Sequence, residues 1–376
     1  MRLKVPAVVG GVVAAAAAAA TAGVVHERRE VNRERARIDP RSAALFGALP
    51  IDRESVVEAD DGLALHVEEV GPADAPITVL FVHGFALNAG SFHFQRLALT
   101  ETFGDHVRMV FYDLRSHGRS ARSAQAGCTI AQLGRDLHTV IKAVIPSGPI
   151  VLVGHSMGGM TIMEFAAQQP ELFQHDAAPP KRGRVDRISS VALINTSSGN
   201  LRTVTLGLPS VLARLRGPVL PVVLRRAAKN VQLVEKTRAL GKDLAWVVTK
   251  RLSFSSPDVD PAVVAYCTNM ISATPVDVVS DFYGTLMDHD GHLGLMNMVG
   301  CSAVVIGADH DALTPVSHTQ AIAMALPDAE LLIAPNSGHL LMLEHPDLVD
   351  KPLIQLVESA LQSASKPRWA RHRARA

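Results

Sequence analysis

Ser156 lies between two glycines at a point where a strand-like pattern gives way to a helical one. The apolar residues 150–153 lead into Gly-x-Ser-x-Gly over residues 154–158, and a helix-forming stretch follows. A tight turn of this kind leaves no room for a Cβ near the serine, so Gly154 and Gly158 would let its hydroxyl project from an exposed corner at a helix N-terminus. The pattern indicates a nucleophile elbow, with a plain glycine-rich turn as the alternative.

A serine hydroxyl is a poor nucleophile until a neighbouring base removes its proton and a third group holds that base in one tautomer. Candidates for both partners follow strand-like apolar runs. Asp309 and Asp311 come after residues 303–306, and His339 comes after the next such run. Because the carboxyl ends of parallel strands meet at one edge of a sheet, these side chains are expected near Ser156. The order Ser, Asp, His therefore suits acyl transfer by a triad.

The elements that would position these residues alternate along the chain. Strand-like runs cover residues 63–70, 77–82, 107–112, 150–153, 191–194, 303–306 and 330–334, and helical patterns cover 130–145, 157–169, 316–326 and 348–361. All strands after the first are apolar enough to be buried on both faces. This alternation predicts an α/β fold with a mostly parallel central sheet and helices on both faces.

Five motifs in this order resemble those of the α/β-hydrolase superfamily, in particular its single-domain esterases, lysophospholipases and monoacylglycerol lipases. They are His83-Gly84-Phe85 after a strand, Asp113-Leu114-Arg115-Ser116-His117-Gly118-Arg119-Ser120, the elbow at Ser156, Asp311-Ala312-Leu313-Thr314-Pro315, and Ser337-Gly338-His339. The resemblance spans about residues 55–361 of the chain. It implies the α/β-hydrolase fold and a serine hydrolase activity.

The resemblance also implies a role for each member of the triad. Ser156 would attack an acyl carbonyl, His339 would accept and return the proton, and Asp311 would orient His339. The Thr-Pro spacing favours Asp311 as the acid, whereas a shorter gap after Gly307 would favour Asp309.

The same resemblance implies an oxyanion hole made by the backbone N–H groups of Phe85 and Met157. Gly84 would let the loop approach closely, and His83 would brace it by hydrogen bonding. This chemistry requires no metal and no cofactor. The expected substrate is a small-molecule carboxylic ester, with apolar or lipid-like acyl groups favoured. Thioesterases, peptidases, C–C hydrolases, perhydrolases and acyltransferases share the triad, and a membrane-tethered binding protein without catalysis is the alternative of another class.

Residues 199–300 interrupt the alternation at the place where the superfamily inserts a helical cap over its active site. We expect such a cap to gate access and to shape the substrate pocket. Between Leu201 and Arg251, eleven Lys or Arg residues stand against two acidic ones. This balance fits either the solvated faces of amphipathic helices or a cap that rests on an anionic membrane surface.

Residues 1–37 form a segment ahead of the predicted catalytic domain at 38–376. After Arg2 and Lys4 comes an uncharged run, in which residues 7–25 would make a helix of about 28 Å, close to the roughly 30 Å of a hydrocarbon core. The length of this run therefore favours a membrane anchor.

Five arginines lie within residues 28–37, directly after this run. By the positive-inside rule they favour an uncleaved anchor with a cytoplasmic catalytic domain. The alternative is a secretory signal peptide cleaved after Ala20-Thr21-Ala22. Residues 27–37 mix Arg and Glu and would form a charged helical or flexible stalk.

Composition fits a folded enzyme and limits its partners. The chain has 376 residues, 48% of them hydrophobic, and a formal charge of +1. A net charge near zero argues against nucleic acid as the main partner. Cys128, Cys267 and Cys301 are widely spaced and odd in number, which predicts neither a disulfide framework nor a metal site.

Overall fold

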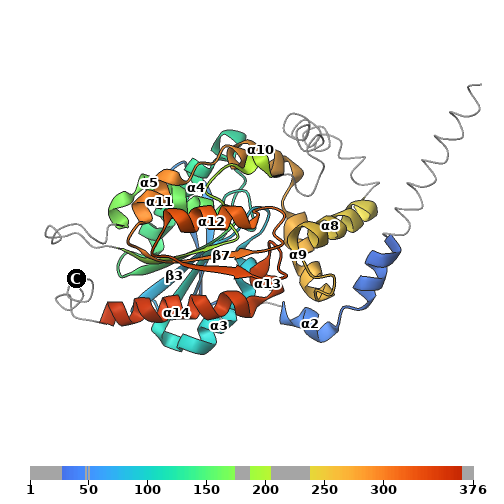
Figure 1. Cartoon of the computed structure of the whole chain (residues 1–376), viewed down its shortest axis with the longest axis horizontal. Coiled ribbons are helices and arrows are strands. Elements are labelled where there is room, and N and C mark those ends of the chain that lie inside the picture. The colour runs from blue at the N-terminus through green and yellow to red at the C-terminus, as the bar shows by residue number, and fades with distance from the viewer. Residues whose placement is uncertain (1–27, 47–48, 50, 174–186, 205–237, 366–376) are drawn as a thin grey trace, which may run out of the picture.

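The computed structural model of the chain describes residues 28–46, 49, 51–173, 187–204 and 238–365. A sheet lies at its centre (Figure 1). This sheet has eight strands in the order β1-β2-β4-β3-β5-β6-β7-β8. The strands are β1 (Arg53–Glu58), β2 (Ala64–Val70), β3 (Ile77–Val82), β4 (Val107–Tyr112), β5 (Ile150–His155), β6 (Ile188–Ile194), β7 (Ser302–Ala308) and β8 (Glu330–Ala334). Strands β3 to β8 pair in parallel, whereas β1–β2 and β2–β4 are antiparallel. The predicted α/β fold with a mostly parallel sheet is confirmed.

Strand β1 is the one strand of this sheet that the sequence pattern does not predict. It lies at the sheet edge, and Val57 is its one buried residue. An edge strand needs few apolar side chains, so the charged sequence Arg-Glu-Ser-Val-Val-Glu carries no clear strand signal. Strands β3, β4 and β5 are buried along their whole length, as their apolar runs predict. The prediction that residues 330–334 are also buried on both faces is wrong, because β8 lies at the other edge of the sheet and Ala334 is its one buried residue.

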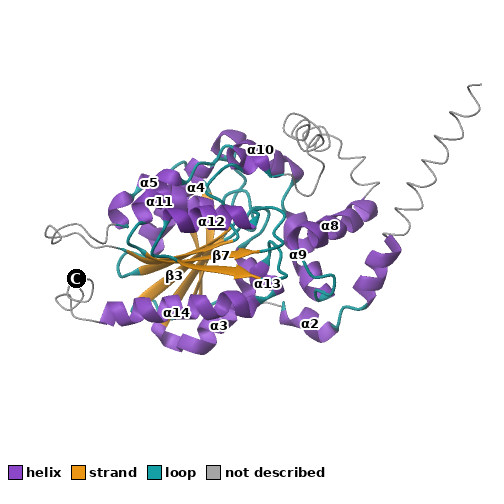
Figure 2. Cartoon of the chain, in the orientation of Figure 1, coloured by secondary structure: helices purple, strands orange, loops and turns teal. Residues whose placement is uncertain are grey.

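Helices cover both faces of the sheet (Figure 2). On one face lie α3 (His93–Phe103), α13 (Leu341–Glu344) and α14 (Pro346–Ser365), and on the other lie α4 (Ile130–Val144), α5 (Met157–Gln168), α11 (His292–Met298) and α12 (Val316–Ala325). Two apolar cores result, because neighbouring side chains of a strand point to opposite faces. In β5, Leu152 packs in the core with Leu137 and Phe165, whereas Val153 packs in the core with Leu99.

Three further helices lie between β6 and β7, in the range expected for a cap. They are α8 (Arg238–Ser253), α9 (Pro261–Ala273) and α10 (Val276–Met287). Helix α11 falls in the same range but packs directly on α5, where the Asn297 side-chain amide donates to the Ala166 carbonyl at 2.9 Å. Residues 205–237, which carry many of the basic residues noted above, lie outside the described residues. The boundaries of the cap and of the catalytic domain stay a prediction.

The segment that follows the apolar N-terminal run is helical over residues 28–36 and docks on α8 (Figure 1). The Trp246 indole N–H donates to the Glu34 carboxylate at 2.8 Å. After α2 (Pro40–Leu45), Phe46 stacks on Tyr266 of α9 with ring centroids 4.5 Å apart. The predicted charged stalk is therefore a helix fixed to the helices between β6 and β7.

The predicted membrane anchor falls on residues 1–27, which lie outside the described residues. Among the residues that the structure does describe, no single helix has both the length and the apolar composition of a membrane span. Helices α9 and α10, which meet at 88°, meet that criterion only as a bent pair, by length and composition alone. The membrane anchor and the cytoplasmic orientation stay predictions.

Candidate active site

Ser156 occupies the turn between β5 and α5, with backbone angles φ 51° and ψ −119°. A positive φ is costly for a residue with a Cβ, and such strain is typical of a nucleophile elbow. A Cβ at Gly158 would lie 1.9 Å from the Val82 carbonyl oxygen, and one at Gly154 would lie 2.7 Å from the Gly159 nitrogen. Because only glycine fits at these two positions, the chain can turn sharply enough to present Ser156 at the sheet edge.

Ser156, His339 and Asp311 form one hydrogen-bonded chain. His339 Nε2 lies 3.0 Å from Ser156 Oγ, and His339 Nδ1 lies 2.8 Å from Asp311 Oδ2. Asp311 follows β7 and His339 follows β8, so both reach the carboxyl edge of the sheet where Ser156 lies. When Nδ1 carries the proton, it donates a hydrogen bond to Asp311, and Nε2 is left as the acceptor for the serine hydroxyl.

The surroundings of Asp311 hold it as a carboxylate. Its Oδ1 accepts from the N–H groups of Leu313 and Thr314, both at 2.8 Å. Its Oδ2 accepts from the Thr314 hydroxyl at 2.7 Å and from the Asn195 amide at 2.8 Å. Burial on its own raises the pKa of Asp311, but the nearby His339 and these donors outweigh it and lower the pKa to about 2.

Asp309, the alternative acid, does not contact the imidazole of His339. One of its carboxylate oxygens lies 2.7 Å from His310 Nδ1 and accepts from the Ser337 N–H at 3.2 Å. Its side chain is 37% exposed, whereas that of Asp311 is fully buried. The geometry therefore gives Asp309 a role in the turn before His339 and brings Asp311 to the imidazole.

No motif in the sequence singles out Asn195, although its amide touches Asp311. The residue directly follows β6 and adopts φ 42°, in the left-handed region that Asn tolerates. A usable signal was present. The polar run Asn195-Thr196-Ser197-Ser198 begins where a buried strand ends, at the same sheet edge as the other site residues.

The backbone N–H groups of Phe85 and Met157 face no hydrogen-bond acceptor among the described residues. Met157 opens α5, so its N–H also lies at the positive end of a helix dipole. A Cβ at Gly84 would lie 3.2 Å from the Ser156 Cβ and 2.5 Å from His155 Nδ1. Gly84 therefore lets the Phe85 loop close on the serine, as an oxyanion hole requires.

His83 braces this loop from both sides. Its Nδ1 lies 2.7 Å from the Gly84 carbonyl oxygen, and the Leu114 N–H donates to its Nε2 at 2.9 Å. Only a neutral ring protonated at Nδ1 satisfies both contacts. Burial lowers the pKa of His83 to about 4, in agreement with a neutral structural histidine.

His155 holds the backbone at His339. Its Nε2 lies 2.9 Å from the carbonyl oxygen of His339, so the ring donates from Nε2. Burial lowers the pKa of His155 to about 3, which keeps the ring neutral next to Ser156. His155 thus positions the His339 main chain without contacting the serine hydroxyl.

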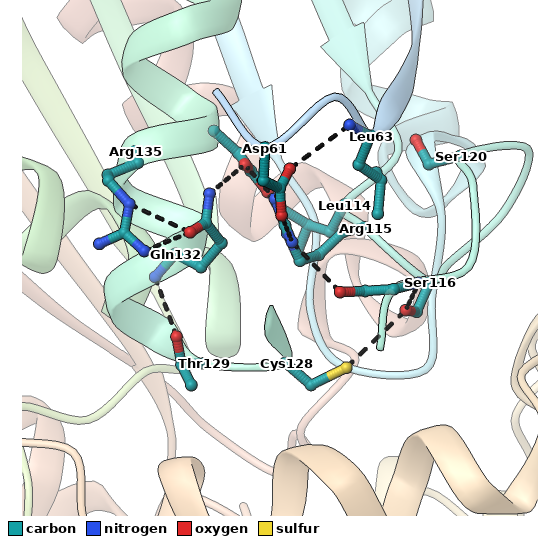
Figure 3. Close-up of polar contacts among 12 residues, drawn as sticks. Asp61, Leu63, Leu114, Arg115, Ser116, Ser120, Cys128, Thr129, Gln132 and Arg135 are labelled. Carbon is teal, nitrogen blue, oxygen red and sulfur yellow. Dashed lines mark hydrogen bonds and ion pairs between the residues drawn. The ribbon is translucent and has the colours of Figure 1, made fainter. Parts of the chain in front are cut away.

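The loop after β4 is tied by an ion-pair network around the buried Arg115 (Figure 3). Arg115 is fully buried, and its guanidinium pairs with Asp136 of α4 (Nε–Oδ2 2.6 Å) and with Asp61 (Nη1–Oδ2 2.8 Å). The same loop carries His117, whose ring packs against Phe85 with centroids 5.6 Å apart. Because a buried charge without its partner is strongly destabilising, this network holds the loop that backs the Phe85 segment.

Within the described residues, no three His, Cys, Asp or Glu side chains come together in an arrangement that could hold a metal ion.

Comparison with known proteins places the chain in a family. The model of the alpha/beta hydrolase family matches residues 79–351, and the chain belongs to that family. It is a hydrolase by this membership. The resemblance inferred from the five sequence motifs is thereby confirmed.

Individual relatives are more distant. A Variovorax paradoxus protein provisionally named as the carbamate hydrolase RutD is 27% identical over 279 residues, which cover 74% of this chain and 90% of that protein. An esterase from Thermogutta terrifontis superposes with a TM-score of 0.60 at 22% identity, covering 82% of this chain and 99% of that one. A bacterial membrane phospholipase A superposes with a TM-score of 0.58 at 20% identity, covering 94% of this chain and 98% of that one. At these identities, the two solved structures show that this chain shares their fold.

Proposed function

We propose that the chain is a serine hydrolase that cleaves carboxylic esters through an acyl-enzyme intermediate. The observation that carries the proposal is the hydrogen-bonded chain from Ser156 Oγ through His339 to Asp311, at 3.0 and 2.8 Å. The strained elbow at Ser156 and the two N–H groups at Phe85 and Met157 support it, because acyl transfer needs both an exposed nucleophile and a bound oxyanion.

In the first half of the reaction, Ser156 Oγ attacks the acyl carbonyl carbon while its proton passes to His339 Nε2. The carbonyl electrons move onto oxygen, where the N–H groups of Phe85 and Met157 bind the negative charge. The intermediate then breaks its bond to the alcohol oxygen, which takes the proton from His339 and leaves. Asp311 stabilises the imidazolium and keeps its tautomer correct.

In the second half, a water molecule attacks the acyl-Ser156 ester and gives a proton to His339. Collapse of the new intermediate releases the carboxylic acid and returns the proton to Ser156 Oγ. Each donor of the oxyanion hole typically contributes roughly 10²–10³-fold in kcat, so the two backbone N–H groups matter more than the side chains that bear them.

We further propose that the substrates are apolar or lipid-like acyl esters and that residues 5–25 tether the enzyme to a membrane. The length of the apolar run and the excess of basic residues between 201 and 251 support this part of the proposal. The similarity to a membrane phospholipase A over 94% of the chain points in the same direction. The arginines after the run favour a cytoplasmic catalytic domain, with secretion after signal cleavage as the alternative.

Labelling with a fluorophosphonate probe tests the proposed nucleophile. The wild-type chain should be phosphonylated at Ser156, and Ser156→Ala should not be labelled. Ser359→Ala, at an exposed position of α14, is the matched control and should be labelled like the wild type. Labelling that persists in Ser156→Ala, or wild-type protein that is folded and unlabelled, would overturn the proposal.

A further inference from the structure

Glu344 joins two segments that are far apart in the sequence. It ends α13, and its Oε2 accepts from the N–H of Gly338 at 2.6 Å. Its Oε1 accepts from the N–H groups of Ser255 and Ser256, at 2.8 and 2.9 Å. One half-buried carboxylate therefore holds three main-chain donors, and hydrogen bonds to a charged acceptor are about twice as strong as neutral ones.

The two segments are the turn that carries His339 and residues 253–256, which comprise the last residue of α8 and the three that follow it. Their main chains also meet directly, because the Leu340 N–H donates to the Ser253 carbonyl at 2.9 Å. A Cβ at Gly338 would lie 2.7 Å from the Phe254 Cα. The residues on both sides of His339 are thus fastened to the end of α8.

We propose that Glu344 is a positioning residue that sets the distance between His339 Nε2 and Ser156 Oγ. The proposal rests on the proposed serine hydrolase function. Asp311 orients the imidazole ring, but the ring moves with its own main chain. That main chain is held by His155 at the His339 carbonyl and by Glu344 through Gly338 and residues 253–256. A displacement of about 1 Å between reacting groups costs on the order of 10²-fold in rate.

The proposal also gives the helices between β6 and β7 a role in forming the triad. Residues 253–256 continue α8, which itself contacts the helix at 28–36 through Trp246 and Glu34. A shift of α8 would therefore be transmitted to Gly338 through the Glu344 carboxylate.

The test compares Glu344→Gln with Glu358→Gln, the same substitution at an exposed position of α14. For each variant, kcat and KM are measured on a p-nitrophenyl ester, with active sites counted from the extent of fluorophosphonate labelling at completion so that unfolded protein does not enter kcat. The rate of fluorophosphonate labelling at Ser156 is measured in parallel. We expect Glu344→Gln to lower kcat and the labelling rate together by about 10- to 100-fold, and Glu358→Gln to leave both unchanged.

If Glu344 had only a structural role, Glu344→Gln would lower the melting temperature and the number of active sites, while kcat per site stayed at the wild-type value. That outcome overturns the inference. If Glu344→Gln does not fold, Glu344→Asp keeps the charge and shortens the side chain, and it should lower kcat per site and the labelling rate together below the wild-type values. Wild-type values of both in folded Glu344→Asp would overturn the inference. Failure of the proposed function is distinguishable, because wild-type protein would then not be labelled at Ser156 at all.

Discussion

The carboxylate of Asp311 accepts hydrogen bonds from Leu313, Thr314 and Asn195, which hold it in place. It also accepts from His339 and therefore fixes the orientation of that imidazole. An amide at this position would donate from one of its atoms and would favour the wrong tautomer of His339. We therefore expect Asp311→Asn to lower kcat by about three to four orders of magnitude.

Asp309→Asn is the control for this prediction, because Asp309 contacts His310 and Ser337 and does not contact the imidazole of His339. It should change kcat on a p-nitrophenyl ester by less than about threefold, as is usual for a partly exposed side chain away from the reacting groups. If Asp309→Asn were the more damaging variant, the assignment of the acid would be wrong.

Ser156 and His339 act on the same proton, so their substitutions should not add. We expect Ser156→Ala and His339→Ala each to abolish hydrolysis of a p-nitrophenyl ester and the double variant to be scarcely worse than either. The residual kcat values of the three variants, measured at matched folded concentrations, give the comparison. A double variant that is slower by the product of the two single effects would contradict a shared proton-transfer step.

His117 is buried against Phe85 and His83, and burial lowers its pKa to about 3. In the unfolded chain the pKa of His117 is near 6.5, so His117 binds a proton more readily there than in the folded protein. Its contribution to stability is therefore complete above about pH 6.5 and is lost progressively as the pH falls toward 3.

This linkage predicts that the free energy of unfolding of the wild type falls between pH 6.5 and 4, and that it falls less steeply in His117→Gln. His106→Gln, at an exposed position, should keep the wild-type slope. Urea unfolding at several pH values measures the slopes. Equal slopes in the wild type and His117→Gln would show that His117 does not titrate as a buried neutral group.

At the scale of elements, the elbow depends on the close approach of α5 to β3. A Cβ at Gly158 would lie 1.9 Å from the Val82 carbonyl oxygen, so Gly158→Ala must push the helix from the strand. We expect a loss of about 3 kcal/mol in the free energy of unfolding and a loss of Ser156 labelling. Gly284→Ala in α10, where a Cβ would meet nothing within 4 Å, should instead be stabilising by roughly 0.5–1 kcal/mol.

Urea unfolding of both variants distinguishes these expectations. Equal effects at Gly158 and Gly284 would mean that the packing of α5 on β3 tolerates a side chain at the elbow.

The elements that could be predicted from the sequence are those whose burial is reflected in their composition. The apolar strands from β3 to β7 and the helices α4 and α5 appear where their patterns indicate, because both faces of these strands and one side of each helix are buried. Strand β1 and helix α3 escape prediction, since an edge strand and a helix with mixed polarity lack such a pattern.

The candidate site divides in the same way. Ser156, Asp311 and His339 lie in short motifs whose spacing is local, so the sequence alone marks them as candidates, and the structure brings them into one hydrogen-bonded chain. Asn195 and Glu344 act through contacts with segments distant in the sequence, and those contacts arise only when β6, α8 and α13 have packed. No local pattern encodes which carboxylate reaches which main-chain donor.

At the scale of the whole molecule, the helix at 28–36 connects the predicted anchor to α8. Arg35 and Asp243 pair at 2.7 Å, and Val31 is 2% exposed and belongs to the same apolar core as Trp246 of α8. A chain that begins at Arg28 keeps these contacts, whereas one that begins at Ile38 removes them and exposes the apolar side of α8. We therefore expect both shortened chains to be soluble, and the longer of them to melt at a higher temperature.

Full-length protein should remain in the membrane fraction after carbonate extraction, because residues 5–25 are long enough to span. Protease added to intact cells should spare the catalytic domain if the arginines after the run stay in the cytoplasm. A mature N-terminus at Gly23 in secreted material would contradict both the anchor and its orientation, and it would leave the proposed chemistry untouched.

The central claim is that Ser156 carries the acyl group between two chemical steps, and trapping that intermediate tests it most directly. The protein is mixed with a p-nitrophenyl ester, quenched in acid during the first turnover, digested and analysed by mass spectrometry. The account predicts the mass of the acyl group on the peptide that contains Ser156, with one equivalent of nitrophenol released in the burst. Ester hydrolysis that proceeds with no acyl group on this peptide, or with the acyl group on another residue, would contradict it.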